Sequence, residues 1–242
     1  MKIAIMGAMT DEVEPFLNLG EHEPLLKYFK KHNDISYGGN LYHEANYKGL
    51  EIVLAYSKIG KVNAALTAAT MIEKFGAEQL LFTGVAGAVN PELKIGDLVA
   101  ATQLCQHDLD ITSFGHPHGY VPEGKVYVEP SRELLHMAQS VADEKGIVLK
   151  GGIVATGDQF IDDPERKEWI KNTFEADAIE MEGAAVAVVC DALNVPFFVL
   201  RAISDAADAD ATFDFEEFLK HSSQVSSSFV LAMLDKIADG QA

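Results

Sequence analysis

Short apolar runs recur along the chain, and each one stops at a glycine or at a charged or hydroxyl side chain. Runs of this length without polar alternation are typical of strands buried on both faces of a parallel sheet. The segment Asn40–Tyr56 instead alternates on either side of Lys48-Gly49, which predicts a hairpin. The other predicted strands are Lys2–Met6, Gln79–Thr83, Asp97–Cys105, Leu149–Thr156, Ala178–Met181 and Phe197–Ile203.

Between these runs, apolar residues recur at intervals of three and four positions, and this period predicts helices. Ser131 and Gly146 are typical first and last boundary residues of a helix, and Pro164 suits a first turn. The predicted helices are Asp11–Leu19, Lys61–Phe75, Ser131–Lys145, one that starts at Pro164, Glu182–Leu193 and Glu216–Ile237. Strands that alternate with helices predict an α/β fold with three α/β/α layers.

Composition narrows the class of protein. The chain has 242 residues and no linker-like or repeated segment, so we expect a single domain over residues 1–242. Its net charge of −18 disfavours nucleic acid as a partner. Cys105 and Cys190 lie in apolar runs, as buried thiols do in a reducing compartment. The first apolar stretch is too short for a signal peptide, and no stretch reaches a transmembrane length. We therefore expect a cytoplasmic protein without membrane association.

Polar clusters follow four of the predicted strands: Gly7–Glu12, Gly84–Gly87, Glu180–Glu182 and Arg201–Asp205. Ligands of open α/β sheets bind beyond the carboxyl ends of the strands, so these clusters are expected to meet in one crevice. Each cluster also has a plain structural interpretation, because glycines make tight turns and single carboxylates stabilise helix N-termini. Carboxylates at three strand ends are more than helix capping requires.

Three converging carboxylates, Glu12, Glu182 and Asp205, suit the cleavage of a glycosidic bond. That reaction passes through a cationic sugar, which anionic side chains stabilise. It also needs an acid for the leaving group and a base for the nucleophile. Crowded carboxylates do not all ionise together, so one of them can stay protonated near neutral pH.

Neither a metal nor a cofactor is expected. The histidines of the loop, His107, His116 and His118, match no recognised spacing of metal ligands. The two cysteines form no CxxC pair, which disfavours a structural zinc site. Dinucleotide and Walker A fingerprints are absent from the sequence.

Five segments together carry a family resemblance: IAIMGAMTDE, SKIGKVNAA, FTGVAGAV, IEMEGAAVAVVC and FVLRAISDAAD. The chain resembles the 5′-methylthioadenosine/S-adenosylhomocysteine nucleosidases of the purine nucleoside phosphorylase-like superfamily, from Met1 to about Lys236. The resemblance implies a central twisted mixed β-sheet and hydrolysis of an adenine N-glycosidic bond. It also implies a role in methionine salvage.

The resemblance assigns chemical roles to the carboxylates and their neighbours. Glu12 would activate the attacking water, and Arg201 would help to position the groups on that side. Glu182 would bind the ribose hydroxyls, and Asp205 would protonate the purine at nitrogen 7. The remaining substrate contacts would come from Met181 against the sugar, Ser204 beside the acid, Phe160 stacked on adenine, Ile161 at its edge, Phe215 over the site, Ile59 at the 5′ substituent and Val85 beside the catalytic groups.

The same resemblance implies a homodimer, because in the family a partner subunit completes the 5′ pocket. The matching residues of this chain are Phe114, His116 and Pro122.

One motif departs from the usual family pattern. Family members often read TGSAGG where this chain has Thr83–Ala88, so Val85 brings no hydroxyl to the site. Val85 and the loop HDLDITSFGHPHGYVPE resemble the Helicobacter and Campylobacter branch of the family. Enzymes of that branch also cleave 6-amino-6-deoxyfutalosine, a menaquinone precursor. The resemblance therefore implies a wider 5′ pocket and a part in menaquinone biosynthesis.

Two other functions stay open at this point. A nucleoside phosphorylase shares the fold but binds phosphate, which requires basic residues or free N–H groups. The loop after the first strand offers Asp11 and Glu12 instead, and this favours water as the nucleophile. A nucleoside-binding or storage protein without catalysis is the second alternative, although simple binding does not need three carboxylates.

Overall fold

The computed structural model describes residues 1–17, 29–207 and 211–240. Its strands are β1 (Lys2–Gly7), β2 (Phe29–Tyr37), β3 (Asn40–Tyr47), β4 (Leu50–Tyr56), β5 (Gln79–Ala88), β6 (Leu98–Gln106), β7 (Leu149–Thr156), β8 (Ala178–Glu180) and β9 (Phe197–Asp205). Its α-helices are α1 (Thr10–Leu17), α2 (Lys61–Glu73), α3 (Arg132–Lys145), α4 (Pro164–Phe174), α5 (Gly183–Leu193) and α6 (Ala211–Asp239). The α/β class predicted from the sequence is confirmed.

The strands form one mixed sheet in the order β2-β3-β4-β1-β5-β8-β7-β6-β9. β1 runs parallel to β4 and β5, whereas β2, β3 and β4 are antiparallel neighbours. β5 also pairs in parallel with β9, so that β5, β8, β7, β6 and β9 close into a ring. The predicted plain sandwich is therefore corrected to a sheet whose one end is a closed barrel.

The closure depends on the length of β5. The prediction ended this strand at Thr83, but it continues to Ala88 through Gly84 and Gly87. A register shift between Ala86 and Gly87 marks the point where β5 adds antiparallel pairing with β8. Glycines and irregularities of this kind bend a strand, and a bent strand can serve two neighbours.

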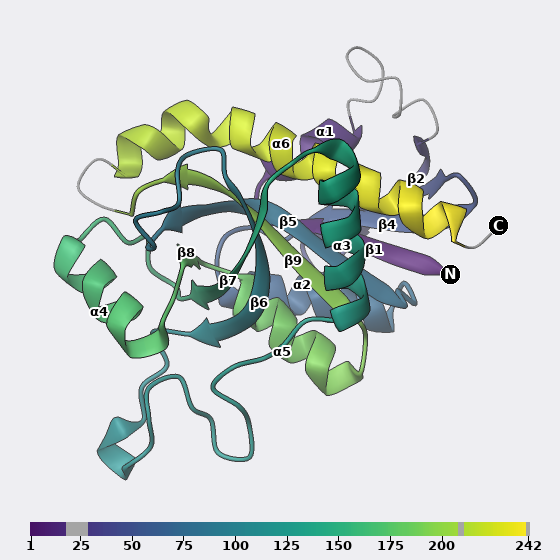
Figure 1. Cartoon of the computed structure of the whole chain (residues 1–242). Coiled ribbons are helices and arrows are strands. Elements are labelled where there is room, and N and C mark those ends of the chain that lie inside the picture. The colour runs from purple at the N-terminus through teal and green to yellow at the C-terminus, as the bar shows by residue number, and fades with distance from the viewer. Residues whose placement is uncertain (18–28, 208–210, 241–242) are drawn as a thin grey trace.

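Helices cover two faces of the sheet (Figure 1). On one face, α1, α3 and α6 bury Phe16, Leu134 and Phe229 in a single apolar cluster. On the other face, Met71 of α2 and Val186 of α5 belong to a second cluster. Helices therefore pack on both faces of the sheet, although the sheet itself closes at one end.

Local signals placed several boundaries correctly. The Ser131 side chain accepts a hydrogen bond from the Leu134 N–H, and Gly146 takes the left-handed conformation after α3. Lys48 and Gly49 have the positive φ values that a tight hairpin turn requires. β2 was not predicted, and the end of the predicted helix Asp11–Leu19 lies outside the described residues. Among the helices that the structure describes, none has the length and apolar character needed to cross a membrane.

Candidate active site

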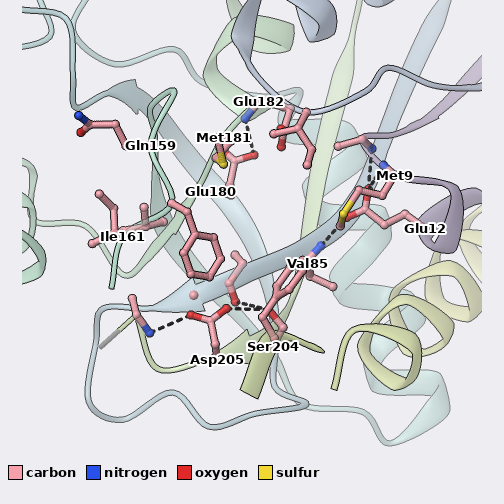
Figure 2. Close-up of a pocket in the computed structure, with 18 residues that line it drawn as sticks. Met9, Glu12, Val85, Gln159, Ile161, Glu180, Met181, Glu182, Ser204 and Asp205 are labelled. Carbon is pink, nitrogen blue, oxygen red and sulfur yellow. Dashed lines mark hydrogen bonds between the residues drawn. The ribbon is translucent and has the colours of Figure 1, made fainter. Parts of the chain in front are cut away.

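A cavity of about 300 Å³ opens where β1, β5, β8 and β9 come together. This volume is at the lower end of the range of small-ligand pockets. Figure 2 shows Glu12, Glu182 and Asp205 reaching it from different sides. The described residues that line it are Ala8, Met9, Glu12, Ile59, Val85, Ala86, Gly87, Gln159, Phe160, Ile161, Ile179, Glu180, Met181, Glu182, Ser204, Asp205, Ala207 and Phe215.

Glu12 is buried at the start of α1 and is held by backbone N–H groups. Its Oε2 accepts hydrogen bonds from Ala8 at 2.5 Å and Met9 at 2.9 Å, and its Oε1 accepts one from Val85 at 3.0 Å. Burial raises the pKa of this carboxyl, while the nearby Arg201 charge and the three N–H groups oppose the rise. A buried carboxylate with a raised pKa and a fixed position is suited to accept a proton from a bound molecule.

Glu182 stands at the start of α5 but does not cap it. Its Oε1 accepts a hydrogen bond at 2.8 Å from the N–H of Gly60, the residue that directly precedes α2. Burial, followed by the neighbouring Glu180 charge, raises the pKa of Glu182 to about 8. The rise favours the protonated form of Glu182, which can donate a hydrogen bond as well as accept one.

Asp205 ends β9 and is oriented by two neighbours. The Ser204 hydroxyl donates to its Oδ2 at 2.9 Å, and the Ala207 N–H donates to its Oδ1 at 2.9 Å. A Cβ atom on Gly87 would lie 2.6 Å from Asp205 Oδ1, so a glycine is needed where β5 passes this carboxyl.

Glu180 is a buried carboxylate at the site. The sequence prediction assigned it no role. Glu180 pairs with Arg201 at 2.6 Å and accepts from the Thr156 hydroxyl and the backbone of Glu182 and Gly183. The only signal for it in the sequence was its place as the first acidic residue of IEMEG. Its contacts hold the first turn of α5, and through that turn they hold Glu182.

Arg201 lies behind the cavity rather than in its lining. Its guanidinium stacks on the Phe82 ring, with the carbon at 4.0 Å from the ring centroid, and binds Glu180. It therefore acts on the cavity through Glu180 and through its charge near Glu12. The role that the resemblance gives Arg201, to help position the groups on the Glu12 side, stays a prediction.

The opposite wall of the cavity is apolar and aromatic. Phe160 meets Phe215 of α6 nearly edge to face, with ring centroids 5.7 Å apart. Ile161 is buried beside them, whereas Ile59 is 54% exposed at the rim. This wall fits a flat, apolar group such as a purine base.

The fold brings together Glu12, Ile59, Val85, Phe160, Ile161, Met181, Glu182, Ser204, Asp205 and Phe215 of the predicted site. Phe114, His116 and Pro122 are outside this cavity, and the Phe114 side chain is 81% exposed. Their predicted place is in the pocket of a partner subunit, which a single chain does not contain.

Charge distinguishes the candidate chemistries. Among the described residues that line the cavity there is neither a lysine nor an arginine. The described part of the chain also has no group of three or more His, Cys, Asp or Glu side chains arranged to hold a metal ion. The arrangement can thus bind a largely neutral molecule and exchange protons with it.

Comparison with known proteins places the chain among enzymes. The family profile described as the phosphorylase superfamily matches residues 2–235. An aminodeoxyfutalosine nucleosidase of Campylobacter jejuni is 54% identical, and the match covers 98% of this chain and 100% of the relative. A 5′-methylthioadenosine/S-adenosylhomocysteine nucleosidase of Actinobacillus succinogenes is 38% identical over 98% of this chain and 100% of the relative. The structure of the nucleosidase from Helicobacter pylori with butyl-thio-DADMe-Immucillin-A superposes with a TM-score of 0.93, at 46% identity and 98% coverage of both chains.

Proposed function

The chain belongs to the phosphorylase superfamily, and on this premise we propose that it is a purine nucleosidase that hydrolyses adenine N-glycosidic bonds with water. Its proposed substrates are 5′-methylthioadenosine, S-adenosylhomocysteine and 6-amino-6-deoxyfutalosine. The observation that carries the proposal is the convergence of Glu12, Glu182 and Asp205 on one cavity without a basic side chain in its described lining.

The nucleophile is assigned to the Glu12 side. Glu12 accepts a proton from water as the water oxygen bonds to the anomeric carbon of the ribose. The N–H groups of Ala8, Met9 and Val85 keep its carboxylate in place during this step. Val85 contributes through its backbone, so the missing serine hydroxyl at this position does not remove the contact.

The leaving group is assigned to the Asp205 side. As the bond between the sugar and the base breaks, its electron pair moves into the purine ring, and Asp205 supplies a proton to nitrogen 7. Ser204 orients this acid. Glu182 binds the ribose hydroxyls and Met181 packs on the sugar, while Phe160, Ile161 and Phe215 enclose the adenine.

Phosphate is the alternative nucleophile in this superfamily, and product analysis decides between the two. We expect the purified protein to release adenine and free methylthioribose from methylthioadenosine at the same rate with and without phosphate. A phosphorylated pentose that forms only with phosphate would establish a phosphorylase and remove the role of Glu12. Binding of the nucleoside with no release of adenine would instead support a binding protein.

Cleavage of 6-amino-6-deoxyfutalosine is proposed because the Campylobacter jejuni relative described above is an aminodeoxyfutalosine nucleosidase. It would give the protein a place in menaquinone biosynthesis beside methionine salvage. The exposed Ile59 at the cavity rim leaves room for a larger 5′ substituent. Adenine release from both substrates is expected. Cleavage of methylthioadenosine alone would contradict this part of the proposal.

A homodimer is also proposed, with Phe114, His116 and Pro122 reaching the partner's 5′ pocket. Exposed apolar side chains support an interface: Val62 is 79% and Leu66 is 52% exposed on one face of α2. Sedimentation of the protein measures this, and a monomer that retains full activity would exclude it. A single nucleosidase domain over residues 1–242 and a cytoplasmic location stay predictions from the sequence.

A further inference from the structure

Next to the cavity, three residues from distant parts of the chain contact one another in a ring. They are Lys61 at the start of α2, Asp108 after β6 and Asp158 after β7, here termed the clamp. None of them lines the cavity, and the proposed reaction gives none of them a role.

Every side of the ring is a short contact. Lys61 Nζ pairs with Asp108 Oδ1 at 2.6 Å, and the Asp158 N–H donates to Asp108 Oδ2 at 2.8 Å. The ring closes where the Lys61 N–H donates to Asp158 Oδ1 at 2.8 Å. Both carboxylate oxygens of Asp108 are therefore used, one for a side chain and one for the backbone of another segment.

The ring is partly shielded from solvent. The side chains of Lys61 and Asp108 are 17% and 18% exposed, less than in the exposed ion pairs of the chain. Burial by itself would raise the pKa of Asp108, but the hydrogen bonds from Lys61 and from the Asp158 N–H lower it overall. Contacts of this kind cost more to break than pairs on an open surface.

The clamp joins two walls of the cavity. Asp158 directly precedes Gln159, Phe160 and Ile161, all of which line the cavity. Lys61 directly follows Ile59, which lines the rim, and Gly60, whose N–H binds Glu182. Two links therefore join the aromatic wall to the wall that carries Glu182. The Lys61 N–H binds Asp158 directly, and Lys61 Nζ binds Asp108, which in turn accepts from the Asp158 N–H.

We propose that Lys61, Asp108 and Asp158 are positioning residues that hold the base-binding wall in register with the ribose-binding wall. The proposal rests on the proposed function, because it interprets these walls as binding sites for the two halves of a nucleoside. A small displacement of such walls weakens binding even when the reacting groups are intact.

Steady-state kinetics of Lys61→Met test the proposal, because methionine keeps the apolar stem and the backbone link to Asp158 but removes the charge that pairs with Asp108. We expect the KM for methylthioadenosine to rise about 10-fold while kcat changes less than about threefold. The turnover number is spared because Glu12 and Asp205 are held by contacts that the clamp does not share. An unchanged KM in a folded variant would overturn the proposal.

Lys236→Met is the matched control. Lys236, near the end of α6, pairs with Glu144 of α3, whereas Phe215, the cavity residue of that helix, lies near its start. This variant removes an ion pair away from the cavity, so KM is expected to stay at the wild-type value. An equal rise in KM in both variants would indicate general destabilisation and would contradict the positioning role.

Two substrates separate positioning from direct binding. S-adenosylhomocysteine has a charged amino-acid tail, whereas methylthioadenosine has none. A clamp that positions the walls raises the KM of both by a similar factor in Lys61→Met. A rise confined to S-adenosylhomocysteine would mean that Lys61 binds the tail, and it would overturn the proposal.

Hydrogen exchange tests the clamp without using activity. In Asp108→Ala, the backbone amides of residues 156–161 are expected to exchange at least about tenfold faster than in the wild type. Unchanged exchange there would refute the clamp. If the wild-type protein released no adenine, the proposed function would fail, and the exchange result would still decide whether the clamp orders this wall.

Discussion

Gly84→Ala offers a sharp test of the position of Glu12, because the structure shows what one added methyl group meets. A Cβ atom at Gly84 would lie 2.5 Å from Glu12 Oε1 and 3.1 Å from an Arg201 nitrogen. The backbone of Gly84 does not have the positive φ that disfavours alanine. The effect is therefore steric and falls on the carboxylate.

The magnitude follows from the contacts of Glu12. Carbon–oxygen contacts below 3.0 Å are not found, so Oε1 must move by at least about 0.5 Å. That movement breaks the 3.0 Å hydrogen bond from Val85, and a bond to a charged group contributes roughly 1.5–3 kcal/mol. We expect kcat for adenine release to fall by about 10²-fold, which corresponds to about 2.7 kcal/mol in the barrier.

The assay measures kcat for adenine release from methylthioadenosine in the wild type and the variant, with thermal unfolding measured in parallel. Gly151→Ala is the control, because its Cβ would meet only the methyl group of Thr102, at 3.1 Å, on a strand away from the cavity. In a Glu12→Gln background, Gly84→Ala should have little further effect, since both changes act on one group. A folded Gly84→Ala variant with wild-type kcat would refute the placement of Glu12 as the base.

Three further results are expected. Asp205→Asn lowers kcat by roughly 10²- to 10⁴-fold in an adenine-release assay, and near-normal turnover would remove the acid role. Because the pKa of Glu182 is raised from 4.5 to about 8, its contribution to stability is complete below pH 4.5 and is lost as the pH rises toward 8. Urea unfolding at pH 5 and pH 8.5 should show this loss in the wild type and a smaller one in Glu182→Gln, and equal losses would contradict the raised pKa. Glu180→Gln leaves Arg201 buried without its anionic partner, and urea unfolding should show a loss of about 3–5 kcal/mol, whereas a loss below about 1 kcal/mol would speak against a buried pair.

The sequence predicted most helices and strands because their signals are local. Apolar runs, the Ser131 cap and the Lys48-Gly49 turn act within a few residues, and the structure agrees with them. β2 was missed because Phe29–Tyr37 is mostly polar and carries no strand pattern. Its antiparallel pairing with β3 makes it a strand.

The site was predicted only in part, because some of its features follow from strand ends and others from contacts between strands. Glu12, Glu182 and Asp205 follow or end buried strands, and the rule for strand ends correctly brought them to one cavity. The pairing of Arg201 with Glu180 was not predicted, because it joins β9 to β8. A pairing between strands depends on which edges meet, and no local pattern carries that information.

The sequence by itself determined the alternation of strands and helices, the chemical types of the reacting groups and the family to which the motifs point. Only the tertiary structure decided that β5 pairs with β9 to close the barrel, that Arg201 faces Glu180 rather than the cavity, and that Lys61 meets Asp108 and Asp158. The physical reason is the distance along the chain over which each interaction acts. Periodicity and capping are set by neighbours in the chain, whereas burial, pKa shifts and paired charges arise from groups that only folding brings together.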